Sequence, residues 1–158
     1  IARLLVEELG YAKEEIVPRR KIQTLFAGQF VKSVIDLTVR VNDKTCLVVS
    51  YGPGSLVTRQ RPAIAAARVL EDEYRIPLAV VTNGEDAELL DTGTGKVIDT
   101  GLAAIPDRKK MANLLVSLEV EPFTDPARRE RELRILNAFD VEVCCAGGPC
   151  PLPEAPEG

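Results

Sequence analysis

Apolar residues recur with a helical period at the start of the chain and then give way to extended runs. In residues 2–9 they lie on one face of a helix, and Gly10 follows where a helix often ends. Residues 10–20, which include Pro18, are expected to form a connection. Three extended runs then follow, at about 21–27, 32–41 and 45–51. The second run is rich in β-branched residues, and the third is almost entirely apolar, as in a strand covered on both faces.

The middle of the chain continues with a turn, a helix and a buried strand. Residues 42–43, Asn-Asp, indicate a tight hairpin between the second and third runs. Thr58 is expected to cap a helix that reaches about Tyr74, with Pro62 tolerated in its first turn. Residues 78–82 are apolar and short, which predicts a buried strand.

The last part of the chain is predicted to hold a hairpin and two helices. Residues 87–91 and 96–99 flank a Thr-Gly-Thr-Gly turn. Met111, Leu114, Leu115 and Leu118 follow the spacing of a half-buried helix. Pro126 opens a charged helix that runs to about Phe139, and the Pro- and Gly-rich end is expected to be disordered. We therefore expect an α/β chain divided into residues 1–105, a helical extension 106–140 and a tail 141–158.

Composition limits the class of protein. Hydrophobic residues make up 46% of the 158 residues and charged residues 28%, as in ordinary soluble globular proteins. The net charge of −4 argues against a dedicated nucleic-acid binder, although local basic groups remain. No run approaches the roughly 20 apolar residues of a membrane span, and no secretory signal is visible, so we expect a cytoplasmic location and no membrane partner. The chain begins at Ile1 and not at Met, which leaves open whether a leader or a first element has been trimmed and whether the chain is a piece of a longer protein.

Cysteine and histidine content excludes several kinds of site. The chain has no histidine, which rules out a Ser/His/Asp arrangement. Cys46 lies in an apolar run and is expected to be a small core residue. Cys144, Cys145 and Cys150 have poor spacing for a zinc site, and their role stays open between metal, disulfide and free thiols.

Several short motifs, in this order, carry a family resemblance. They are residues 4–11 (LLVEELGY), 34–38 (VIDLT), 47–49 (LVV), Gln60 and 79–84 (AVVTNG). With the predicted helix, three-stranded meander, helix and strand, they resemble the PD-(D/E)XK, restriction-endonuclease-like fold. More specifically, residues 1–100 resemble the N-terminal domain of the type I restriction enzyme R subunit. The resemblance implies a DNA-cutting ancestry and a magnesium site.

In that family an Asp on the second strand and a Glu on the third hold magnesium, and a Lys two residues after the Glu helps to activate water. The resemblance places Asp36 at the first position, Ser50 at the Glu position and Gly52 at the Lys position. It also places Glu8 and Gln60 near the site. The loss of two of the three groups predicts a catalytically inactive domain that needs no cofactor.

Alternatives remain open at each of these positions. A divergent nuclease would hold magnesium between Asp36 and Glu8. Asp36 would equally fit a structural carboxylate paired with Arg40 or Lys32. Gln60 would also fit an ordinary polar residue in a first helical turn.

The partners of the chain are open in the same way. Three arginines are candidate DNA-binding residues, and ordinary solvated charges would have the same pattern; they are Arg59, Arg61 and Arg68. The charged helix near the end of the chain would also suit a protein partner. A further alternative is a non-enzymatic module that dimerises through helices within residues 107–139.

Overall fold

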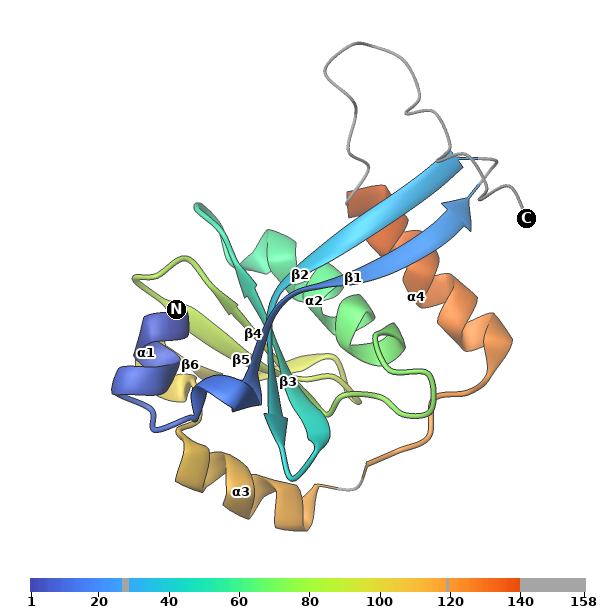
Figure 1. Ribbon diagram of the computed structural model, residues 1–158. Coiled ribbons are helices and arrows are strands. Elements are labelled where there is room, and N and C mark those ends of the chain that lie inside the picture. Colours follow the sequence, from blue (N-terminus) through green and yellow to red (C-terminus); the bar gives the residue numbers. More distant parts are fainter. Residues whose placement is uncertain (27–28, 119, 140–158) are drawn as a thin grey trace, which may run out of the picture.

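A mixed six-stranded sheet forms the centre of the computed structural model, which describes residues 1–26, 29–118 and 120–139 (Figure 1). Its strands are β1 (Ile16–Phe26), β2 (Gln29–Val41), β3 (Lys44–Tyr51), β4 (Leu78–Thr82), β5 (Ala87–Asp91) and β6 (Lys96–Thr100). They lie side by side in sequence order; β3 and β4 are parallel, and all other neighbours are antiparallel. The parallel pair needs a crossover, which a helix supplies.

Helices cover both faces of this sheet (Figure 1). They are α1 (Ala2–Glu7), α2 (Val57–Val69), α3 (Arg108–Ser117) and α4 (Pro126–Phe139), with short 3-10 turns at η1 (Lys13–Glu15) and η2 (Leu102–Ala104). Val48 and Val81 point from β3 and β4 into a core shared with α2 and α4. Leu47 and Val80 point into the opposite core, which α1 and α3 close. The α/β class and the predicted order of elements are therefore confirmed.

The hairpin between β2 and β3 has the predicted tight turn. Asn42 and Asp43 both have left-handed backbones, with φ of 52° and 62°. Two successive left-handed residues match the twist of an antiparallel pair, which is why Asn and Asp suit this turn. The second hairpin, β5–β6, also lies where the sequence predicts it.

The predicted starts of β1 and α2 were wrong. β1 begins at Ile16 and contains Pro18, which the sequence placed in a connection. Because β1 is an edge strand, the missing N–H of proline can face away from the ladder. Helix α2 begins at Val57, so Thr58 is not its N-cap; the Thr58 hydroxyl donates instead to the Ser55 carbonyl.

Helix α2 also ends earlier than predicted, at Val69 and not near Tyr74. Arg129 of α4 donates hydrogen bonds to the carbonyls of Val69 and Glu71, at 3.0 and 2.8 Å. A side chain from a distant helix thus satisfies the last carbonyl of α2 and another just beyond the helix.

Strand β2 changes its facing near its middle, and this change positions the candidate site. Ile35 and Val39 are four residues apart, so in a regular strand both side chains would point to the same face. Ile35 instead packs in the core with α2, and Val39 packs in the opposite core. Arg19, with φ of 53°, lies on β1 between the partners of Ile35 and Leu37, so the irregularity falls opposite Asp36. Asp36 therefore lies where the paired strands twist.

Two other predictions concern the end of the chain and the absence of a membrane span. The tail 141–158 and its three cysteines lie outside the described residues. Among the helices that are described, none is long and apolar enough to cross a membrane.

Candidate functional site

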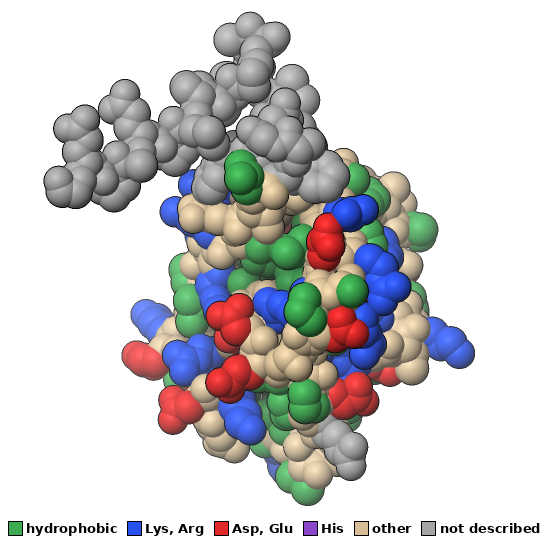
Figure 2. Space-filling model, turned by 90° about the vertical axis from the view of Figure 1, so that its right-hand side faces the viewer, with side chains coloured by type: hydrophobic (Ala, Val, Ile, Leu, Met, Phe, Trp, Pro, Cys, Tyr) green, Lys and Arg blue, Asp and Glu red, His purple; other side chains and the backbone are tan. Residues whose placement is uncertain are grey.

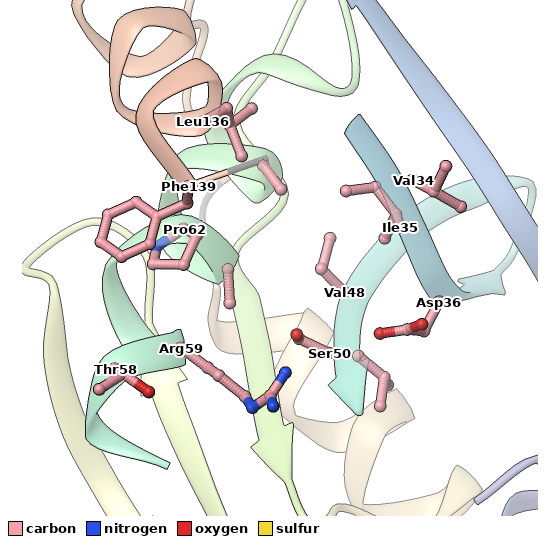
Figure 3. A pocket seen from close by; sticks show the side chains of 13 residues that line it. Val34, Ile35, Asp36, Val48, Ser50, Thr58, Arg59, Pro62, Leu136 and Phe139 are labelled. Carbon is pink, nitrogen blue, oxygen red and sulfur yellow. The ribbon is translucent and has the colours of Figure 1, made fainter. Parts of the chain in front are cut away.

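A pocket of about 280 Å³ lies between β2, β3, α2 and α4 (Figure 3). One part of its wall is apolar and includes Val48, Pro62, Leu136 and Phe139. At the other part the side chains of Asp36, Ser50 and Arg59 point toward one another (Figure 3). A strand pair and the helix after it thus bring an acid, a hydroxyl and a cation together.

The ladder between β2 and β3 explains why Asp36 and Ser50 meet. Leu37 pairs with Val49 in antiparallel register. Asp36, one residue before Leu37, therefore lies beside Ser50, one residue after Val49. Asp36 is exposed, and its Oδ2 accepts a hydrogen bond of 2.8 Å from the backbone N–H of Tyr51. The backbone of β3 therefore holds the carboxylate over the site.

The proposed pairing of Asp36 with Arg40 or Lys32 is not found among the described side chains. Within this part of the chain, neither Arg40 nor Lys32 forms an ion pair with Asp36. Arg40 instead lies 3.9 Å from Asp43, at the hairpin turn. The partner of Asp36 is the β3 backbone.

Arg59 occupies the space above Gly52. A Cβ atom added at Gly52 would lie far inside van der Waals contact with Cζ and both terminal nitrogens of the Arg59 guanidinium. The Nη2 of Arg59 donates to the carbonyl of Pro53 at 2.7 Å, and its Nε is buried without a hydrogen-bond partner in the described structure. A side chain at position 52 and the present position of Arg59 exclude each other.

Two other residues that the sequence placed near the site lie elsewhere. Glu8 lines a separate hollow formed with α3 residues, among them Arg108 and Lys109. Gln60 donates a 2.7 Å hydrogen bond to Glu88 of β5 and does not line the pocket. The structure thus groups Asp36, Ser50 and Gly52 with Arg59, but not with Glu8 or Gln60.

Arg61 and Arg68, two of the three candidate DNA-binding arginines, contact a carboxylate on α4. Glu132 lies 2.8 Å from Arg61 and 2.7 Å from Arg68, and its side chain is only 8% exposed. Arg68 also donates to the carbonyl of Thr92. Both arginines are therefore paired with an acid, although Arg61 stays 42% exposed, while Arg59 lines the pocket.

Glu132 is a structural residue that the sequence did not single out. Burial acts to raise the pKa of this carboxyl, but the contacts with Arg61 and Arg68 outweigh it and lower the pKa below its usual value. Leu136 and Phe139, one and two turns further along α4, line the pocket. The spacing of these three residues was the available signal, and the alternating charges of the helix masked it.

The acids around the pocket do not fit a magnesium site of the nuclease type. Asp36 is the one carboxylate among the described residues that line it. Across the described ranges no group of three or more His, Cys, Asp or Glu side chains could hold a metal ion. Magnesium sites in proteins usually combine carboxylates with substrate phosphates, and a single carboxylate is a weak ligand set.

These features define an α/β domain with a sheet-centred pocket in which one acid faces one arginine. The chain belongs to the family described as the type I restriction enzyme R protein N terminus, whose model matches residues 1–106. Comparison with curated proteins and with solved structures found no match to either. The matched range includes Asp36, Ser50 and Arg59, whereas α4 lies beyond it.

Proposed function

We propose that this chain is a catalytically inactive, restriction-endonuclease-like domain that retains a role in binding DNA. The observation that carries the proposal is that Asp36 is the one acid among the described residues lining the pocket, with Ser50 facing it; the family resemblance would put an acid at position 50 and a lysine at position 52. The order of helix, meander, helix and parallel strand supports the endonuclease-like arrangement.

The chemistry of the remaining groups supports inactivity. Cutting a phosphodiester with magnesium requires a metal that polarises the phosphate and activates water. Asp36 alone gives a weak ligand set, and the Ser50 hydroxyl adds no charge. Arg59 brings a positive charge, but arginine stays protonated and cannot accept a proton from water.

A plasmid-nicking assay tests the proposal directly. Wild-type protein with Mg²⁺ or Mn²⁺ is expected to leave supercoiled DNA as intact as Asp36→Ala does. A nuclease of the same fold class checks that the assay detects cutting. Wild-type nicking that disappears in Asp36→Ala would overturn the inactivity.

The same assay decides the alternative of a divergent nuclease that uses Glu8. That mechanism requires Glu8→Gln to abolish cutting as completely as Asp36→Ala. The structure places Glu8 in a separate hollow, so we expect Glu8→Gln to behave like wild type.

Binding to DNA is tested by fluorescence anisotropy with a short labelled duplex. Saturable binding that weakens with added salt would support the proposal, because contacts with phosphates release counterions. No binding at low salt would leave a protein-interaction role, the non-enzymatic alternative, in its place.

A further inference from the structure

We propose that the pocket binds a phosphate group of the nucleic-acid backbone without a divalent metal, through the guanidinium of Arg59. This inference rests on the proposed DNA-binding function and specifies its chemistry. Position 52 is a glycine, and the guanidinium of Arg59, from the following helix, fills the space above it and lines the pocket.

The packing of Gly52 against Arg59 fixes the position of the charge. Because glycine has no side chain, the guanidinium can lie directly over the end of β3. Its Nη2 is tied to the Pro53 carbonyl at 2.7 Å, which holds the planar group in one orientation. A guanidinium carries five N–H donors, so one bond to the backbone leaves others for a ligand.

The neighbours of Arg59 leave donors for an anion. Its Nε is buried and out of reach of a ligand, so the terminal nitrogens, which point toward Ser50 in Figure 3, are the donors available in the pocket. Among the described residues Arg59 forms no ion pair with an acid, unlike Arg61 and Arg68, whose carboxylate partner is Glu132. Phosphate oxygens accept bidentate hydrogen bonds from arginine, which makes phosphate the matching ligand.

The overall charge of the chain makes this single arginine more important. On the face that Figure 2 shows, acidic and basic side chains are both present. The chain also has a net charge of −4. Binding therefore depends on local donors more than on the overall field.

Asp36 distinguishes a phosphate site from a metal site. In a metal site its carboxylate is a ligand, and Asp36→Asn would weaken metal-dependent DNA binding. In a phosphate site the same carboxylate repels the ligand, and Asp36→Asn would strengthen binding. The two kinds of site thus predict opposite effects of one substitution.

The test is duplex-DNA anisotropy with the full chain, in EDTA and in Mg²⁺. We expect equal affinity of the wild type in both buffers and a several-fold gain for Asp36→Asn. Arg59→Gln is expected to weaken binding about tenfold and to reduce the slope of log Kd against log salt by about one. Arg59→Lys, which keeps the charge, should restore the slope.

Two further variants separate position from charge. Arg3→Gln removes the same charge from α1, on the opposite side of the sheet, and should leave the affinity unchanged. Gly52→Ala keeps every charge but shifts the guanidinium, so it should weaken DNA binding less than Arg59→Gln does and leave the salt slope unchanged. Thermal melting checks that each variant is folded.

The outcomes are distinct. DNA binding that requires Mg²⁺, or that Arg59→Gln leaves unchanged, would overturn the inference while DNA binding itself stands. Absence of DNA binding would overturn the proposed function as well. Inorganic phosphate serves as a competitor: binding of phosphate without binding of the duplex would overturn the assignment to the nucleic-acid backbone.

Discussion

Replacing Glu132 by glutamine removes the charge that joins α4 to α2. Its side chain is 8% exposed, and it contacts Arg68, 18% exposed, and Arg61, 42% exposed. Removing one partner of a fully buried ion pair costs about 3–5 kcal/mol. Water reaches Arg61, and Arg68 keeps its bond to Thr92, so we expect Glu132→Gln to lower the free energy of unfolding by about 2 kcal/mol.

Chemical denaturation and thermal melting measure this loss. For a chain of this length, 2 kcal/mol corresponds to a fall in Tm of about 4–8 °C. The matched control is Glu130→Gln on the same helix. Its ion pair with Arg134 has both side chains at least 60% exposed, so its loss should cost less than about 0.5 kcal/mol.

The effect of Glu132 should also depend on pH in a defined direction. Its pKa is lowered in the folded protein, so its stabilising contribution is complete above the ordinary value of 4.5. The contribution is lost as the pH falls through the lowered pKa, because the folded carboxylate must then be protonated. The stability difference between wild type and Glu132→Gln should therefore shrink below that value. A Glu132→Gln loss no larger than that of Glu130→Gln, at neutral pH, would refute the view that this carboxylate holds α4.

Three further predictions concern the core, the thiol and the assembly state. Leu136→Ala, at a side chain 1% exposed, should cost about 3 kcal/mol in chemical denaturation, and an equal stability would contradict its packing against α2. Burial raises the pKa of Cys46 to about 12, so its thiol should react slowly with a thiol reagent at neutral pH. The measurement uses a variant in which the cysteines of 144–150 are changed to serine, and rapid labelling of the native chain would contradict this burial. Light scattering should give the mass of one chain. Val116 is an 89% exposed apolar residue of α3; a dimer that dissociates on Val116→Glu would favour the dimerising alternative.

Much of the fold follows from local patterns. The apolar third run predicts β3, which is buried on both faces, and the Asn42–Asp43 turn predicts its hairpin. Errors arose where a distant element decides the outcome. Pro18 predicts a connection by its local sequence, and only the position of β1 at the sheet edge allows it in a strand. The end of α2 involves Arg129, which comes from α4.

The candidate site divides in the same way. The meeting of Asp36 and Ser50 follows from strand alternation once the two strands are paired. The packing of Arg59 over Gly52 depends on how α2 crosses the sheet, which no local pattern encodes. The proposed division of the chain at residue 105 stays a prediction, as do the DNA-binding roles of Arg61 and Arg68.

The packing of Gly52 against Arg59 has a consequence for how such a site changes in evolution. A side chain introduced at position 52 would meet the guanidinium of Arg59, which is the end of a flexible side chain and can swing away at little cost. A substitution at position 52 therefore also moves the charge of Arg59. The two positions are coupled, so the effects of changing both are not expected to add.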